Sequence, residues 1–215
     1  MEKRFSESIR SRIKKRGYKM ILSQIILNQT DIVNYKLYNR YKIKQFVWCY
    51  FTDNKKREFQ FDIQYNNENM IIIILSECSP IRTNQYPEIN MREMNDDFFD
   101  NNLFEFIVTF CPTKRCRTTN KRITIKNDEE IKNKIQNKLL QYNLQGEQIY
   151  VISRPKSIEY IKKQKGGNKI RRTYVTCTGI IKSSNKRDTI KLIQSGIGSG
   201  KSDGFGMIKI IPIVN

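Results

Sequence analysis

A glycine-rich run near the C-terminus holds the residue types that could bind a phosphate. Residues 196–206 read GIGSGKSDGFG and contain five of the ten glycines in the chain. A nucleotide-binding P-loop requires a glycine five positions before its Gly-Lys-Ser, and Ser195 stands there. It also requires a helix after the loop, whereas Met207–Val214 is a short β-branched run that predicts a final strand. We therefore predict a loop whose exposed amides and Lys201 bind a phosphate of a larger ligand, the alternative being a turn needed only for close packing.

The positive charge of the chain is concentrated in its second half. The formal net charge is +19. Residues 112–215 carry 23 basic and seven acidic side chains, residues 20–111 carry nine and twelve, and residues 1–19 carry eight and two. A lysine-rich composition imposed by the genome would raise lysine everywhere. The segregation instead indicates a polyphosphate partner, and we predict a nucleic acid, because each neutralised phosphate releases counterions.

The cysteine and histidine content bears on whether the chain holds disulfides, a metal or a cofactor. Five cysteines form no Cys-x-x-Cys pair and histidine is absent, so we expect no disulfide framework, no metal site and no cofactor. Apolar runs stay shorter than the roughly 18 residues of a membrane span. The basic N-terminus lacks the apolar segment of a secretory signal. These features favour a protein of the reducing cytoplasm with no membrane partner.

The first half of the chain contains the alternating and apolar runs that are typical of strands. Four strands are expected, at Met20–Leu27, Arg57–Tyr65, Met70–Ser76 and Pro87–Met94. Between the first two, apolar residues recur at i, i+3, i+4 and i+7, which predicts a helix over Asn34–Phe51. Its expected core residues are Ile43, Phe46, Val47 and Tyr50. An acidic turn at Asn95–Asp97 is the expected boundary between a domain at 20–95 and a domain at 96–215, preceded by a basic extension at 1–19.

The second half repeats this order of elements. Its expected strands are Phe104–Cys111, Glu147–Ser153, Arg172–Ile181 and Gly206–Val214, with a loop around Lys165–Gly167. A helix is expected to begin at Asp128, because acidic residues fill its first turn and apolar residues follow at i+4 steps. A shorter helix covers Arg187–Ser195. The order of strand, helix, strand, strand, helix, strand is that of a ferredoxin-like domain, with the glycine run before its last strand.

Two signatures bear on the kind of RNA partner. Gly204–Ile210 is similar to the glycine-aromatic signature of RNA-recognition motifs, but Asp203 replaces a basic residue and Met207 an aromatic one, which disfavours a general single-strand RNA binder. A larger pattern runs in order along the chain. Its segments are Met20–Ser23, Tyr41–Trp48, Phe110–Lys114, Lys114–Arg117, Val175–Ile181, Leu192–Gly198, Lys201 and Gly204–Ile208. Together they resemble the CasE family, the CRISPR repeat-RNA endoribonucleases of type I-E Cascade complexes.

The resemblance implies a fold, an activity and partners. The fold would be α+β, with two tandem ferredoxin-like domains. The activity would be metal-independent cleavage of CRISPR precursor RNA beside a repeat hairpin. In that reaction a 2′-hydroxyl attacks the adjacent phosphate and leaves a 2′,3′-cyclic phosphate and a 5′-hydroxyl. The partners would be the repeat RNA hairpin and the other Cascade subunits.

The resemblance also implies the residues of the site. Tyr41 matches the tyrosine of the family's helix, and Lys44 stands three residues later, where the family has its catalytic histidine. An ammonium there can stabilise phosphate charge or protonate the leaving oxygen, with Tyr41 positioning the phosphate. The expected RNA-binding residues are Lys114, Arg115, Arg117, Gly196, Gly198, Gly200 and Lys201. Because histidine is absent, two hypotheses stay open: a repeat-RNA endoribonuclease, or a binding-only subunit that caps the 3′ hairpin of an RNA cut by something else.

Overall fold

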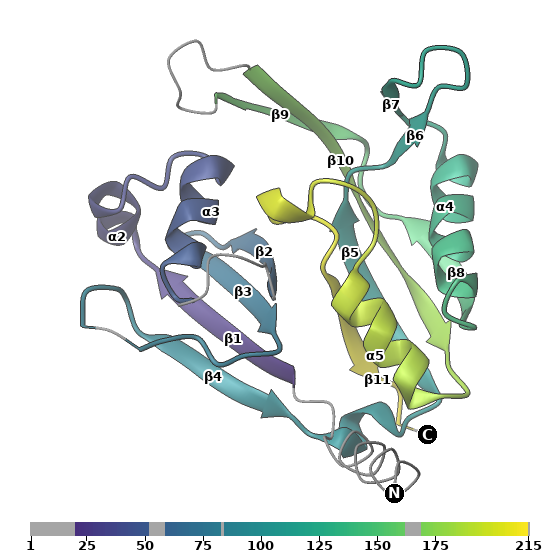
Figure 1. Cartoon of the computed structure of the whole chain (residues 1–215), viewed down its shortest axis with the longest axis horizontal. Coiled ribbons are helices and arrows are strands. Elements are labelled where there is room, and N and C mark those ends of the chain that lie inside the picture. The colour runs from purple at the N-terminus through teal and green to yellow at the C-terminus, as the bar shows by residue number, and fades with distance from the viewer. Residues whose placement is uncertain (1–19, 52–58, 83, 162–168, 215) are drawn as a thin grey trace, which may run out of the picture.

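The strands form two large antiparallel sheets, one in each half of the chain (Figure 1). The structure, a computed structural model, describes residues 20–51, 59–82, 84–161 and 169–214. The basic extension at 1–19 and the loop expected around residues 165–167 lie outside the described residues. None of the helices among the described residues is long and apolar enough to cross a membrane.

The first unit is a four-stranded sheet with two short helices on one face. Its elements are β1 (Met20–Leu27), α2 (Gln29–Asn34), α3 (Arg40–Trp48), β2 (Phe59–Tyr65), β3 (Met70–Ser76) and β4 (Ile89–Met94). The strand order β2-β3-β1-β4 is that of a ferredoxin-like sheet, and Ile25 in the central strand lies opposite Ile72 and Ile89. The described residues between β3 and β4 contain no helix, so only the first crossover of this unit is helical there.

The single helix expected over Asn34–Phe51 is wrong in its first third. The chain instead forms α2 and α3, and Lys36 between them takes a positive φ of 55°. Asparagine explains both helix starts: the side chains of Asn28 and Asn39 each accept the backbone N–H three residues later, which caps α2 and α3 separately. The core face of α3 is confirmed, because Ile43, Phe46 and Val47 are buried.

The second unit has the complete ferredoxin-like order and, among its described residues, three additional strands. Its elements are η1 (Asp96–Phe99), β5 (Leu103–Phe110), β6 (Thr113–Arg115), β7 (Arg122–Thr124), α4 (Asp128–Leu140), β8 (Gln145–Val151), β9 (Lys156–Ile161), β10 (Lys169–Lys182), α5 (Lys186–Ser195), η2 (Lys201–Asp203) and β11 (Ile208–Pro212). The strand order β11-β5-β10-β8 confirms the predicted fold. The strand β9, which pairs with β10, and the β6–β7 hairpin were not predicted from the sequence.

Local sequence explains the helices of this unit. The Asn127 side chain accepts the N–H of Glu130 at 3.0 Å, which caps α4 where three acidic residues fill the first turn. Ile131, Ile135 and Leu139 then bury the predicted face of α4. Leu192 of α5 joins the same core over the sheet.

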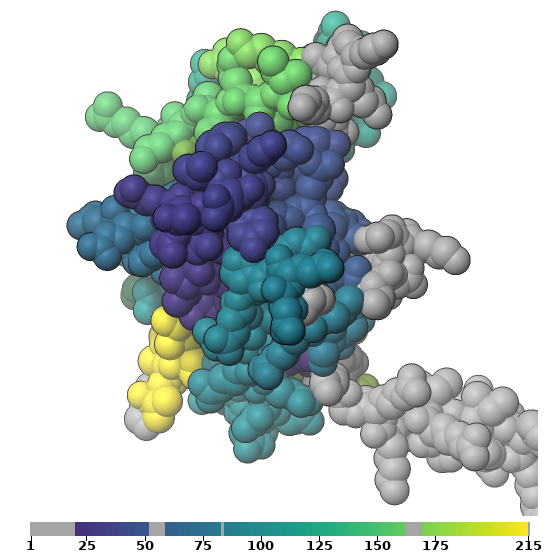
Figure 2. Space-filling view, turned by 90° about the vertical axis from the view of Figure 1, so that its left-hand side faces the viewer, coloured from purple at the N-terminus to yellow at the C-terminus, as the bar shows by residue number. Residues whose placement is uncertain are grey.

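The two units share a core through α5. Ile190 and Ile193 of α5 pack with Met20 and Leu75 from the opposite face of the first sheet. As a result α5 lies between the two sheets, as Figure 1 shows. Figure 2 shows the other side of the first unit, where the purple and blue atoms of α2 and α3 lie below the green atoms of β9 and β10. The division expected at residues 95 and 96 stays a prediction.

Polar contacts also join the units. The Gln60 side chain on β2 donates to the carbonyl oxygens of Ile193 and Gln194 at 2.7 and 2.6 Å, at the C-terminal end of α5. Asp62, two residues further along β2, forms an ion pair with Lys209 of β11. The carboxylate is almost fully buried, with 7% of its side chain exposed. These contacts fix β2 against the two elements that flank the glycine-rich loop.

Candidate nucleic-acid interface

The glycine run forms a closed loop between α5 and β11. All five of its glycines have positive φ angles. The N–H of Ile197 donates to the carbonyl of Gly206 at 2.8 Å, and the N–H of Gly206 donates to the carbonyl of Thr109 at 2.7 Å. These two bonds tie the loop ends to each other and to β5. The middle of the loop is joined to the end of β5 by a bridge between Ser199 and Cys111.

A basic groove of about 880 Å³ lies between this loop, α4 and the β6–β7 hairpin. Its basic lining residues are Lys114, Arg115, Arg122, Lys134, Lys138 and Lys201. Glu130 is the single carboxylate among the described residues that line it, and it pairs with Lys114. A concave surface with this excess of positive charge suits the phosphates of a nucleic acid.

The structure brings most of the expected RNA-binding residues to this groove. Lys114 and Arg115 line it from β6, and Gly196, Gly198, Gly200 and Lys201 line it from the loop. Arg117 is exposed in the turn of the hairpin and is not among the described lining residues. Lys201 is partly engaged within the protein, because its ammonium donates to the carbonyl of Ser195 at the end of α5. RNA binding by these seven residues stays a prediction.

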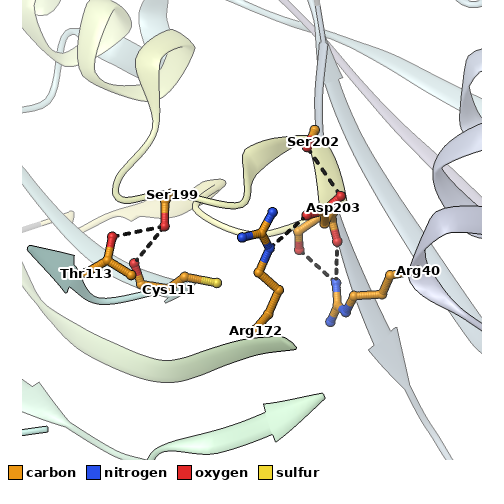
Figure 3. Close-up of polar contacts among 8 residues, drawn as sticks. Arg40, Cys111, Thr113, Arg172, Ser199, Ser202 and Asp203 are labelled. Atoms are coloured by element: carbon orange, nitrogen blue, oxygen red, sulfur yellow. Dashed lines mark hydrogen bonds and ion pairs between the residues drawn. The ribbon is translucent and has the colours of Figure 1, made fainter. Parts of the chain in front are cut away.

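A second basic groove, of about 790 Å³, lies between the β6–β7 hairpin and the β9–β10 ribbon. Its charged residues among those described are all basic: Arg122, Lys126, Arg171 and Arg172. The two grooves share Thr113, Arg122 and Ser199, and Figure 3 shows Ser199 bonded to Thr113 and Cys111 at this boundary. Arg122 and Lys126 lie in and after β7, and Arg171 lies in the first part of β10, and neither segment was predicted from the sequence. Arg172 was expected only as the first residue of a strand, with no role in the site.

The candidate catalytic residues lie on α3, outside both grooves. Tyr41 and Lys44 are partly exposed beside the buried stripe, and neither is among the described residues that line these grooves. Trp48, on the same side, packs edge-on against Phe59 with ring centroids 4.9 Å apart. The helix contacts η2 at the end of the glycine-rich loop, and it also contacts β9. Tyr41 and Lys44 therefore project from an element that touches the loop.

Arg40, which sequence reasoning missed, makes the contact between α3 and the loop. Its Nη1 donates to the carbonyl oxygens of Asp203 and Gly204 at 2.9 and 3.0 Å, and its guanidinium lies 4.0 Å from the ring centroid of Phe205. Arg172 of β10 donates to the carboxylate of the same Asp203 at 3.1 Å, as Figure 3 shows. Burial lowers the pKa of Arg40, but a guanidinium keeps its charge even so.

The fold and the site define a class: tandem ferredoxin-like proteins with a glycine-rich loop before the last strand and a basic groove beside it. The family model described as "CRISPR associated protein" matches residues 20–212. The chain therefore belongs to this family of CRISPR-associated proteins. A search of the curated proteins found no matching sequence.

Solved structures of CRISPR proteins are similar to this chain in fold, and three of them illustrate the likeness. The CRISPR endoribonuclease Cse3 bound to 19 nt RNA is 16% identical, with 90% of this chain and 100% of that chain covered and a TM-score of 0.76. Cas6e from Escherichia coli str. K-12 is 19% identical, with 90% and 100% covered and a TM-score of 0.61. A chain of a CRISPR RNA-guided surveillance complex is 17% identical, with 90% and 100% covered and a TM-score of 0.67. At identities this low the likeness establishes the fold alone, which is the tandem ferredoxin-like fold.

Proposed function

We propose that this protein binds the hairpin of a CRISPR repeat RNA and cleaves the precursor RNA beside it. The observation that carries the proposal is the 880 Å³ basic groove, whose loop wall is contacted by the helix bearing Tyr41 and Lys44. Family membership supports it, as does the likeness in fold to an endoribonuclease bound to RNA. A duplex stem presents closely spaced phosphates on both strands, and a basic groove can contact several of them at once.

The reaction we propose needs no metal. The 2′-hydroxyl of the nucleotide before the cut attacks the adjacent phosphorus and releases its proton to solvent, and the 5′-oxygen of the next nucleotide leaves. The Lys44 ammonium can stabilise the added negative charge and give a proton to the leaving oxygen, and the amine then regains a proton from solvent. Tyr41, one helical turn away, positions the phosphate through its hydroxyl. The products are a 2′,3′-cyclic phosphate and a 5′-hydroxyl.

We further propose that the protein keeps the cleaved hairpin and acts in the cytoplasm as a subunit of a Cascade-like complex. The likeness in fold to a chain of a CRISPR RNA-guided surveillance complex supports this role. A second candidate function is a subunit that binds the hairpin without cutting it. That alternative is favoured by one observation, the lysine at position 44 in a chain without histidine.

Single-turnover cleavage of the cognate repeat RNA in excess chelator tests the proposal. We expect cleavage that Lys44→Ala abolishes, that Tyr41→Phe slows less, and that Lys44→His accelerates, because imidazole exchanges protons near neutral pH. The 2′,3′-cyclic ends identify the reaction. Tight binding without cleavage by the wild type would favour the binding-only function, and undiminished cleavage by Lys44→Ala would remove Lys44 from the mechanism.

Binding is tested separately by its dependence on salt. The logarithm of the affinity should fall linearly with the logarithm of the salt concentration, with a slope of roughly 0.7 to 0.9 per phosphate contacted. Arg115→Ala should lower that slope by about one contact. Arg82→Ala is the matched control, because it removes an exposed arginine of the first unit that is not among the described residues lining either groove. Equal affinity for an unrelated single-stranded RNA would contradict hairpin recognition.

A further inference from the structure

Arg40 links two parts of the proposed site that belong to different units. It is the first residue of α3, directly before Tyr41, and its two acceptors lie more than 160 residues later in the chain. One nitrogen, Nη1, donates to both carbonyl oxygens, of Asp203 and Gly204. The start of the helix is thereby fixed to the end of the glycine-rich loop.

The loop residues that Arg40 contacts are themselves fixed by buried interactions. Asp203 is only 5% exposed, and its carboxylate pairs with Arg172 while its carbonyl accepts from Arg40. Phe205, on which the Arg40 guanidinium lies, is buried and packs against the tilted ring of Tyr174 with ring centroids 5.2 Å apart. An arginine that moved away would therefore lose both carbonyl acceptors and the aromatic ring.

Glycine at position 204 permits the close approach. A Cβ atom added there would lie 2.6 Å from the Phe61 ring and 3.0 Å from Nη1 of Arg40. Phe61 belongs to β2, so the loop meets a strand and a helix of the first unit at this one residue. The close approach of α3 to the loop therefore depends on Arg40 at the start of the helix and on Gly204 in the loop.

We propose that Arg40 is a positioning residue for RNA cleavage: its bonds to the carbonyls of Asp203 and Gly204 hold the Lys44 helix in register with the phosphate-binding loop. This inference rests on the proposed function. The loop would hold the RNA backbone, and α3 would carry the group that acts on it. A displacement of about an ångström between two such groups can reduce a rate by roughly a hundredfold. Removing the contact should therefore slow the chemical step more than it weakens RNA binding.

The experiment compares Arg40→Ala and Arg40→Lys with Lys42→Ala. Lys42 is the matched control, because it is a partly exposed cation on the same helix for which the structure shows no side-chain contact to the described loop residues. Three quantities are measured: the affinity for the repeat hairpin, the single-turnover rate at saturating RNA, and the hydrogen exchange of residues 200–206. The exchange needs no RNA and reports the contact directly.

We expect Arg40→Ala to lower the saturating rate roughly tenfold to a hundredfold and to change the affinity no more than Lys42→Ala does. Arg40→Lys should recover part of the rate, because an ammonium can still donate to the two carbonyls although it lacks the planar stack on Phe205. Exchange of residues 200–206 should accelerate in Arg40→Ala and stay unchanged in Lys42→Ala.

Two results would overturn the proposal. The first is a selective loss of affinity in Arg40→Ala with an unchanged saturating rate, which would make Arg40 an RNA contact. The second is unchanged exchange of residues 200–206 in Arg40→Ala, which would show that the loop does not depend on this residue. A wild type that binds the hairpin but never cuts would instead refute the proposed cleavage, and the role of Arg40 in holding the loop would then be decided by exchange alone.

Discussion

Two glycines of the loop share a backbone conformation but differ in the space around them. Gly200 has a φ of 81° and Gly206 a φ of 82°. An alanine in this left-handed region costs roughly 1 to 2 kcal/mol, and the stiffer unfolded chain offsets about 0.4 to 1 kcal/mol of that. If conformation alone mattered, Gly200→Ala and Gly206→Ala would each lower the free energy of unfolding by about 1 kcal/mol.

The surroundings separate the two substitutions. A Cβ at Gly206 would lie 2.2 Å from the carbonyl oxygen of Ile197, which is backbone and cannot rotate away. The loop ends would have to part, and the bonds from Ile197 N–H and to Thr109 would be lost, at about 1 kcal/mol each. At Gly200 the nearest atoms are Cys111 Sγ at 3.1 Å and Phe205 Cδ2 at 3.2 Å, and these side chains can shift. We therefore expect a loss of about 3 kcal/mol for Gly206→Ala and about 1 kcal/mol for Gly200→Ala.

Urea unfolding followed by circular dichroism measures the difference, with the slope of the transition checked for constancy. Relative to the stability that each variant loses, Gly200→Ala should reduce RNA affinity more than Gly206→Ala does. Gly200 lines the basic groove, whereas Gly206 is not among the described residues that do. Gly200→Ala should fold and bind the hairpin less tightly. Equal unfolding midpoints for the two variants would refute the expectation that the atoms around each glycine determine the loss of stability.

Two further predictions concern other parts of the molecule. Lys209→Met should lower the free energy of unfolding by about 3 kcal/mol in urea titrations, because it leaves the buried Asp62 carboxylate unpaired; a loss as large in Lys209→Met/Asp62→Asn would contradict this. Hydrogen bonds with Thr118 and Thr119 lower the pKa of Cys116 to about 6, whereas burial raises the pKa of Cys111 to about 11 and that of Cys177 to about 12. Because thiolates react, iodoacetamide labelling of Cys116, followed by mass spectrometry, should rise through about pH 6 and then level off, with Cys111 and Cys177 spared at pH 7; equal labelling of the three would refute it.

Elements with a strong local signal could be predicted from the sequence. The face of α4 follows from apolar residues at i+4 steps behind an acidic first turn. The strand β3 follows from a continuous apolar run, and β1 from an apolar run that only Ser23 and Gln24 interrupt. The helix α2 was missed and α3 was expected to begin too early, because the deciding features are the capping bonds of two asparagines, which hydrophobic periodicity does not show. The strand β9 was missed because most of its residues are exposed and Tyr160 alone among them is buried, so its sequence carries little apolar alternation.

The sequence named residues of the loop and of β6 that line the basic groove, but it did not give their arrangement, and RNA binding by them stays a prediction. The glycine spacing indicated a phosphate-binding loop, and six of its described residues line the basic groove, four of which were expected RNA-binding residues. Lys134 and Lys138 of α4 complete that groove, but on a helix surface such lysines look like ordinary solvated charges. Only the tertiary fold, which packs α4 beside the loop, distinguishes them.

The contact between Arg40 and the loop could not be predicted, and the reason lies in the kind of acceptor it uses. Its acceptors are backbone carbonyls, and every residue carries one, so the partner leaves no signal in the sequence. The one visible clue was Asp203, an acidic residue where the RNA-recognition signature has a basic one. In the structure the Asp203 carboxylate accepts a hydrogen bond from Arg172, and the Asp203 backbone carbonyl accepts one from Arg40. The residue that departs from the RNA-recognition signature therefore joins the two units. A departure from a motif is therefore informative when the substituted side chain is buried and paired, because its charge then serves the protein's own assembly and not its ligand.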